Sequence, residues 1–186
     1  MADTPRIRVL YDEAEIARRN EEMARSIAAD APADLLVVAV LKGSFMFVAD
    51  LIRAMHRAGM APQVEFVHLS SYRNATVSSG QVEILRDVQS DVRGREVLLV
   101  DDILESGRTL AFAKDLLAAR GAAKVSSCVL LEKPGKRAVS ITAEYVGFAC
   151  PDYFVVGYGM DVAHAYRQLP FVGVIETADQ ANLPGI

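Results

Sequence analysis

Short apolar runs and stretches with helical spacing alternate along most of the chain. Predominantly apolar runs, each of a length that suits a buried strand, occupy residues 34–40, 64–69, 97–100, 125–131 and 171–175. Apolar residues at helical spacing predict helices over residues 12–29, 44–59 and 109–121. Strands that are apolar throughout are typical of a parallel sheet covered on both faces. The pattern therefore predicts an α/β fold.

Local signals predict the ends of the first two helices. Asp12, followed three residues later by Glu15, matches a capping box at the start of the first helix. Ser44 is expected to cap the second helix, and Gly59 to end it. The apolar residues of that helix predict an inward face made of Phe45, Val48, Ala49, Ile52 and Met55.

Composition narrows the class of protein. The 186 residues are most simply one domain, and 52% hydrophobic with 24% charged residues is a globular composition. A net charge of -4 gives no sign of a general nucleic-acid binder. The longest apolar run has seven residues, from Leu35 to Leu41, and the first eight residues lack a signal-peptide core, so we expect a cytoplasmic protein. Cys128 and Cys150 are expected to be reduced core thiols, and the three histidines are too scattered in sequence to suggest a metal cluster.

The stretch from Val97 to Leu110 carries the most distinctive polar pattern. Its apolar strand ends in Asp101 and Asp102, which a buried strand can carry only where water, a cation or sugar hydroxyls can reach them. A small-residue loop then leads into a helix, whose free N–H groups and dipole favour a bound phosphate, while the acids suit Mg²⁺ and hydroxyls. A ligand with both a phosphate and a polyol fits best, although paired aspartates also occur at strand ends in receiver domains and in plain surface turns.

This stretch consists of four apolar residues, two acids, two apolar residues and then Glu105-Ser106-Gly107-Arg108-Thr109. It resembles the phosphoribosyl-pyrophosphate (PRPP) loop of type I phosphoribosyltransferases. Competing phosphate loops fit worse, because neither GxxxxGK[ST] nor GxGxxG occurs in the chain. The resemblance implies a doubly wound, mainly parallel sheet in a single domain, 1–186, with a small hood formed by the terminal segments over the base site. It also implies that residues 106–109 bind the 5-phosphate, that Asp101 and Asp102 bind ribose hydroxyls and metal, and that Glu105 is the base toward purine N7.

Three further loops resemble parts of the same site. Lys42 and Gly43 match a turn that binds pyrophosphate and follows a cis peptide bond in the family, although Lys-Gly after a strand is an ordinary turn about as often. Ser71 and Tyr72 match the head of a lid loop, although the polar composition of 71–82 equally suits a mobile surface hairpin. Lys133 matches the lysine that contacts purine O6; without the resemblance, a solvated loop lysine would be favoured.

The segment from Cys150 to Asp161 closely resembles the purine-binding segment of hypoxanthine-guanine phosphoribosyltransferases. Phe154 takes the position of the phenylalanine that stacks on the base, and Val155 that of the neighbouring backbone contact. Asp161 matches the acid that helps to hold a second Mg²⁺ on pyrophosphate, and Arg167 the arginine that pairs with pyrophosphate. Without the resemblance, residues 154–156 would be assigned to the core.

Together these segments imply a purine-salvage enzyme that joins a 6-oxopurine (hypoxanthine, guanine or xanthine) to PRPP. The resemblance also implies Mg²⁺ as cofactor and a homodimer or homotetramer, with no nucleic-acid or membrane partner. Two residues depart from the family pattern, because Glu105 stands where aspartate is usual and Val162 where an aromatic residue is common. A second hypothesis is a phosphoribosyltransferase-like regulator that binds nucleic acid and senses nucleotides; the retained acid and the negative net charge favour the enzyme.

Overall fold

The computed structural model describes residues 6–32, 35–71 and 82–176, whose strands form two separate sheets. The larger sheet has the order β4-β3-β2-β5-β6-β7, and all neighbouring pairs are parallel except the antiparallel pair of β3 and β4. Its strands are β2 (Leu36–Leu41), β3 (Gln63–Ser71), β4 (Val82–Arg86), β5 (Glu96–Leu104), β6 (Lys124–Glu132) and β7 (Tyr145–Ala149). The predicted α/β fold with a mainly parallel sheet is confirmed.

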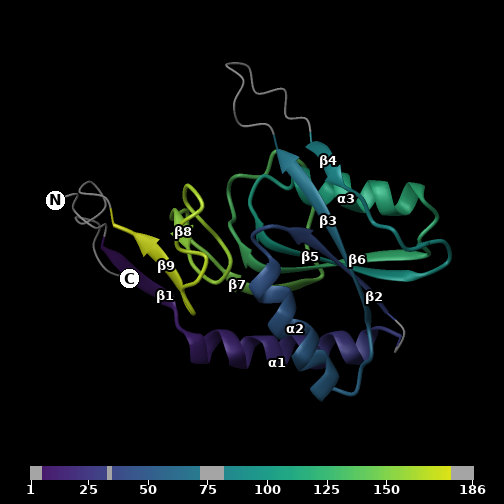
Figure 1. The fold of residues 1–186 in the computed structure, drawn as a ribbon, viewed down its shortest axis with the longest axis horizontal. Helices are drawn as coiled ribbons and strands as arrows, with labels where there is room; N and C mark the ends of the chain where they lie inside the picture. Colours follow the sequence, from purple (N-terminus) through teal and green to yellow (C-terminus); the bar gives the residue numbers. More distant parts are fainter. Residues whose placement is uncertain (1–5, 33–34, 72–81, 177–186) are drawn as a thin grey trace.

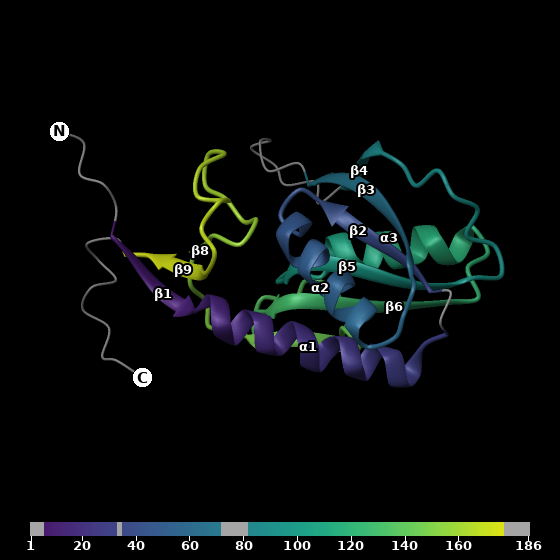
Figure 2. The ribbon, with the colours of Figure 1, turned by 60° about the horizontal axis from the view of Figure 1, so that its bottom comes forward.

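The smaller sheet is antiparallel and joins the two ends of the described chain. It has the order β1-β9-β8, built from β1 (Ile7–Tyr11), β8 (Val155–Val156) and β9 (Val172–Ile175). In both ribbon views it lies to one side of the larger sheet, near the start of α1 (Figures 1 and 2). Because β8 directly follows Phe154, this sheet fixes the backbone of the segment that resembles a purine site.

The helices cover both faces of the larger sheet. α1 (Glu13–Asp30) and α2 (Phe45–Arg57) pack on one face, and α3 (Arg108–Ala119) packs on the other (Figure 2). Successive strand residues point to opposite faces, so each strand contributes to both layers. In β2, for example, Val37 and Ala39 face α1 and α2, whereas Leu36 and Val38 face the layer of α3.

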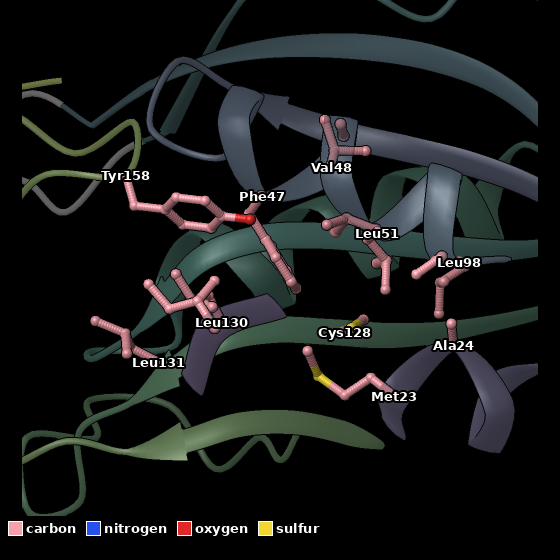
Figure 3. Packing of buried hydrophobic residues seen from close by; sticks show 14 of the residues in the cluster. Met23, Ala24, Phe47, Val48, Leu51, Leu98, Cys128, Leu130, Leu131 and Tyr158 are labelled. Carbon is pink, nitrogen blue, oxygen red and sulfur yellow. The ribbon is translucent and has the colours of Figure 1, made fainter. Parts of the chain in front are cut away.

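The main core lies between α1, α2 and the larger sheet. Figure 3 shows Met23 of α1 and Phe47 and Leu51 of α2 converging on side chains of β5 and β6, including Leu98 and Cys128. Leu98 and Phe47 are at most 1% exposed. Cys128 and Cys150 are both buried and free, as predicted. Burial raises the pKa of the Cys128 thiol, which keeps it protonated at neutral pH.

α1 begins as its sequence predicts. The Asp12 carboxylate accepts a hydrogen bond from the Glu15 N–H at 2.8 Å, and the Glu15 carboxylate accepts one from the Asp12 N–H at 2.9 Å. Both partners are acidic, which also suits the positive end of the helix dipole. The buried stripe that follows consists of Ile16, Asn20, Met23, Ala24 and Ile27.

Two predictions for α2 were right only in part: Ser44 is the N-cap residue, and Val48 and Met55 of the predicted inward face are buried. The Ser44 hydroxyl does not cap the helix; it is fully buried and donates to the Val40 carbonyl at 2.5 Å, at the end of β2. The buried face consists of Phe47, Val48, Leu51, Ala54 and Met55, and Phe45, Ala49 and Ile52 lie at its margins. All of the first five residues of α2 are apolar, so spacing alone could not fix which side of the helix faces inward.

The candidate site is built at the carboxyl ends of β2, β5 and β6. Among the described residues, no helix is long and apolar enough to cross a membrane.

Candidate active site

A single cleft of about 1180 Å³ lies at the carboxyl ends of β2, β5 and β6, facing the segment around β8. In open α/β sheets this edge is the usual place for a ligand. The cleft brings together residues from four separate parts of the chain that the sequence singled out: Lys42, Gly43, Asp101, Asp102, Glu105, Ser106, Gly107, Arg108, Thr109, Lys133, Phe154, Val155, Asp161 and Arg167. Of the predicted site residues, Tyr72 and the side chain of Ser71 fall outside the described part of the structure.

Asp101 and Asp102 line the cleft near the end of β5, which continues to Leu104 and so extends beyond the strand 97–100 that the sequence predicted. Asp101 is 7% exposed, and its carboxylate accepts a hydrogen bond from the Asp102 N–H at 2.9 Å. Burial raises the pKa of Asp101 well above its usual value, and the neighbouring Asp102 carboxylate raises it further. Burial also raises the pKa of Asp102, although hydrogen bonds and the charge of Arg167 oppose that shift. Two adjacent acids, one buried and one half-buried, favour a ligand that brings positive charge or hydroxyl donors.

The turn after β2 packs directly against these acids. The peptide bond between Leu41 and Lys42 is cis, as in the family turn that this segment resembles. Gly43 lies so close to the acidic strand end that a Cβ atom there would come within 1.6 Å of the Asp102 Oδ2. Only glycine fits this approach, which places the backbone of the turn beside the carboxylates while the Lys42 side chain remains exposed.

The loop from Glu105 to Thr109 leads into α3 and also lines the cleft. Gly107 occupies the N-cap position with a φ of +80°, a conformation that favours glycine. The first helical hydrogen bond runs from the Ala111 N–H to the Gly107 carbonyl at 2.9 Å, so the preceding N–H groups have no partner within the helix. One of them, the Arg108 N–H, donates to the Ser106 hydroxyl at 3.4 Å. Such a turn is suited to a phosphate group.

Glu105 and Lys133 meet at the far end of the cleft. The Lys133 ammonium is almost completely buried, with its residue 6% exposed, and lies 3.5 Å from the Glu105 Oε1. Burying an ammonium is costly unless acceptors surround it, so a ligand acceptor at this place would be favourable. Lys136 lies 3.9 Å from the same carboxylate oxygen and 2.6 Å from Asp152.

Phe154 also faces this cleft, and its residue is 51% exposed. Without the family resemblance, residues 154–156 would be assigned to the core. That assignment is right for Val155 and Val156, which are buried in the smaller sheet, and wrong for Phe154. An exposed ring at the rim of a polar cleft is available to stack on a flat ligand.

Asp161 and Arg167 also line the cleft. An Arg167 nitrogen lies 2.7 Å from the Asp161 Oδ1, and the guanidinium also donates to the Gly159 carbonyl at 2.7 Å. The Asp161 Oδ2 accepts a hydrogen bond from the His164 N–H at 2.8 Å. The arginine is therefore held in one orientation at the cleft wall.

The donor set fits a magnesium ion that is shared with a ligand. Among the described residues, no group of three or more His, Cys, Asp and Glu side chains comes together as a protein-only metal site. Mg²⁺ is usually bound by one or two carboxylates together with substrate phosphates, which is what Asp101 and Asp102 at the end of β5 can provide.

Sequence reasoning missed two residues beside the site. His68, on β3, lines the cleft although nothing in its local pattern indicated this. Arg137 lies behind Glu105 and Lys133 and contacts the backbone of both. Its position in a loop of mixed residues gives no signal that could have identified it.

Comparison with known proteins identifies the family. The phosphoribosyl transferase domain family matches residues 8–163. The chain belongs to the phosphoribosyl transferase family. It is 40% identical to the hypoxanthine phosphoribosyltransferase of Escherichia coli K12 over 94% of this chain and 98% of that protein. It is also 40% identical to the hypoxanthine-guanine phosphoribosyltransferase of Bacillus subtilis 168, over 92% of this chain and 94% of that one.

The fold of this phosphoribosyl transferase also matches solved structures. A hypoxanthine phosphoribosyltransferase from Staphylococcus aureus superposes with a TM-score of 0.84 at 38% identity, covering 90% of each chain. The predicted resemblance to type I phosphoribosyltransferases is thereby confirmed. The hypothesis of a nucleic-acid-binding regulator finds no support in these comparisons.

Proposed function

We propose that this phosphoribosyl transferase joins hypoxanthine, and guanine as a second substrate, to PRPP and releases pyrophosphate. The observation that carries the proposal is the meeting of Glu105 and Lys133, 3.5 Å apart, in the same cleft as the acidic strand end and the start of α3. The E. coli and B. subtilis relatives, named for hypoxanthine and hypoxanthine-guanine transfer, support this choice of purine.

The sugar-phosphate half of the cleft would bind PRPP. Residues 106–109 at the start of α3 would hold the 5-phosphate through backbone N–H groups and hydroxyls. Asp101 and Asp102 would accept hydrogen bonds from the ribose hydroxyls. The turn at Lys42 and Gly43, together with Arg167, would bind the pyrophosphate and stabilise its growing negative charge.

The purine half would orient the base and take its proton. Phe154 would stack on the ring, the Val155 backbone would contact its edge, and the Lys133 ammonium would donate to O6. As the bond from the purine nitrogen to the sugar carbon forms, the carbon–oxygen bond to pyrophosphate breaks and its electrons leave with pyrophosphate. The proton that the purine loses passes to the Glu105 carboxylate.

Magnesium would assist on the sugar-phosphate side. Asp101 and Asp102 are placed to hold one ion, and Asp161, which lines the same cleft, would help to hold a second. When bound, Mg²⁺ neutralises pyrophosphate charge as the leaving group departs. We expect turnover to be lost in excess EDTA and restored by adding Mg²⁺ back.

The surroundings of the site complete the proposal. The smaller sheet of β1, β8 and β9 would serve as a hood over the base, in one domain with the larger sheet. Two free, buried cysteines fit the reducing cytoplasm, where we place the protein. By resemblance to its family, we propose a homodimer or homotetramer.

One assay tests the activity. The protein is incubated with PRPP, Mg²⁺ and, separately, hypoxanthine, guanine and xanthine, and nucleotide formation is measured for each. We expect the nucleoside monophosphates of hypoxanthine and guanine, with pyrophosphate in equal amounts. No nucleotide from any of the purines would contradict the proposal, and tight gel-shift binding of nucleic acid at physiological salt in the same preparation would favour the regulator instead.

A further inference from the structure

Arg137 bridges the ends of two neighbouring strands behind the cleft. Its Nη1 donates to the carbonyls of Leu104 at 2.8 Å and Glu105 at 2.6 Å, and at 3.4 Å to the carbonyl of Lys133. Its Nη2 donates to the Glu132 carboxylate at 2.5 Å. The side chain is 22% exposed, so these contacts form largely out of water.

The chemistry of these contacts calls for arginine. The carbonyls of Leu104 and Glu105 lie where β5 ends and its ladder of hydrogen bonds stops. A carbonyl near a protein interior is costly when it has no donor. Arg137 supplies a donor to the Glu105 carbonyl and a second one to the Leu104 carbonyl, which also accepts from the Lys133 N–H. A guanidinium presents several donors in a rigid plane, whereas a lysine ammonium is a point charge on a flexible stem. Lysine could keep the ion pair with Glu132 but could not satisfy the same set of carbonyls in fixed geometry.

Backbone contacts extend the same junction. The Lys133 N–H donates to the Leu104 carbonyl at 3.0 Å, and the N–H groups of Ala138 and Val139 donate to the Ser106 carbonyl at 2.9 and 3.2 Å. The loop after β6 therefore runs alongside the loop after β5. Arg137 is the side chain that joins the carbonyl of the candidate base to the carbonyl of the candidate purine-binding lysine.

We propose that Arg137 is a positioning residue that sets the separation of the Glu105 carboxylate from the Lys133 ammonium. The proposal rests on the proposed function. In a 6-oxopurine, O6 and N7 lie on the same edge of the ring, so one ligand edge must meet both groups at once. The 3.5 Å between the carboxylate oxygen and the ammonium nitrogen suits that requirement. Because Arg137 contacts the backbone behind these groups, its effect on the reaction passes through them.

A double-mutant cycle separates positioning from a general structural role. Arg137→Lys is made in the wild-type chain and in a Glu105→Gln chain, and kcat, the KM for hypoxanthine and the Kd for PRPP are measured. In the wild-type chain we expect kcat to fall about 10- to 100-fold and the hypoxanthine KM to rise several-fold, with the PRPP Kd within about twofold. In the Glu105→Gln chain, Arg137→Lys should lower kcat by less than about threefold, because the proton acceptor is already gone. The hypoxanthine KM should still rise, because Arg137→Lys also displaces Lys133.

Two control variants keep the test decisive. Arg120→Lys removes a guanidinium that pairs with Asp87 at similar exposure, 33%, outside the cleft, and should leave the kinetics unchanged. Glu132→Gln removes the ion pair of Arg137 but leaves its bonds to the carbonyls, and should keep kcat within about threefold even if Arg137→Lys folds poorly. Thermal melting of each variant reports folding.

Several results would overturn the proposal. An equal loss of kcat from Arg137→Lys in both chains would show a general structural role, and wild-type kinetics of Arg137→Lys would show no role. A tenfold or greater loss from Glu132→Gln would show that the ion pair, and not the contact with the carbonyls, matters. If the wild-type protein itself forms no nucleotide from hypoxanthine and PRPP, the proposed function fails, which is a different outcome from these.

Discussion

The two halves of the cleft are built in different ways. The sugar-phosphate half comes mainly from one continuous segment, in which Asp101 and Asp102 lie near the end of β5 and residues 105–109 lead into α3. The purine half is assembled from separate segments, because Lys133 follows β6, Phe154 precedes β8 and Glu105 belongs to the loop of the other half. The first half depends on local geometry, whereas the second depends on how distant segments pack.

The two halves also differ in how closely their parts pack, although a charged group of each is buried. Asp101 is 7% exposed and Lys133 is 6% exposed. Gly43 packs against Asp102 with no room for a side chain, whereas Phe154 of the purine half is 51% exposed. We therefore expect changes in the sugar-phosphate half to disturb packing and binding together, and changes in the purine half to weaken purine binding more selectively.

The largest effect is expected from Gly43→Ala. The new Cβ atom would fall 1.6 Å from the Asp102 Oδ2, so either the turn or the carboxylate must move. Because a displacement of about 1 Å at a reacting site can cost about 100-fold in rate, we expect kcat/KM for PRPP to fall by that much or more. Steady-state kinetics with varied PRPP measure the loss.

Gly59→Ala is the matched control for this change. Gly59 follows α2 with a positive φ of +87°, but a Cβ there would meet no atom within 4 Å. That variant should lose some thermal stability because of backbone strain and keep its kinetics. Wild-type kinetics of Gly43→Ala would contradict the close packing that distinguishes the sugar-phosphate half.

A smaller and more selective effect is expected from Lys133→Ala. Loss of a hydrogen bond from a charged donor typically costs about 1.5 to 3 kcal/mol, so the KM for hypoxanthine should rise about 10- to 100-fold. The Kd for PRPP, measured by calorimetry, should change little. Lys124→Ala, at the opposite end of β6, removes an exposed lysine paired with Glu96 and serves as the control. If Lys133→Ala weakened PRPP and purine binding equally, the two halves would not be separable.

Phe154→Ala should have the smallest effect of the three. Aromatic stacking contributes about 0.5 to 1.5 kcal/mol beyond buried area, which corresponds to a rise of about 3- to 10-fold in the purine KM. Because the ring is 51% exposed, the melting temperature should change by only a few degrees. Phe66→Ala, a change of another exposed phenylalanine on β3, should leave the purine KM unaltered. An unchanged KM for Phe154→Ala would remove this ring from the purine half.

The sequence allowed prediction of features that local chemistry determines. The capping box of α1, the buried strands and the acidic end of β5 were all visible, because each depends on residues close together in the chain. The inward face of α2 could not be predicted in full. Because the helix begins with consecutive apolar residues, packing against α1 and the sheet decides which of them face inward. The role of Ser44 also depended on packing, because its hydroxyl bonds a strand carbonyl instead of the helix.

The candidate site shows the same division. The pattern of residues 101–109 alone indicated a site for a phosphate and for Mg²⁺ or hydroxyls, whereas the roles of Glu105, Lys133 and Phe154 were inferred from resemblance to a family. His68 and Arg137 were missed because only the folded chain brings them to the cleft or behind it. Contacts between loops that follow neighbouring parallel strands have no local signature in the sequence.

Glu105 connects the two halves, since it begins the phosphate loop and its carboxylate lies beside Lys133. A carboxylate can accept a proton, whereas an amide of the same shape cannot. Glutamate at this position keeps that chemistry although aspartate is usual in the family pattern. The comparison of Glu105→Gln with Glu105→Asp therefore separates the effect of losing the carboxylate from the effect of shortening the side chain.

The most direct test is the turnover of Glu105→Gln with saturating PRPP and hypoxanthine, together with its Kd for PRPP. We expect kcat to fall about 10- to 1000-fold while the PRPP Kd stays within a few-fold, and Glu105→Asp to retain substantial activity. If Glu105→Gln turns over at the wild-type rate on every purine, the proton passes to another group or to water, and the assignment of Glu105 as the base is wrong.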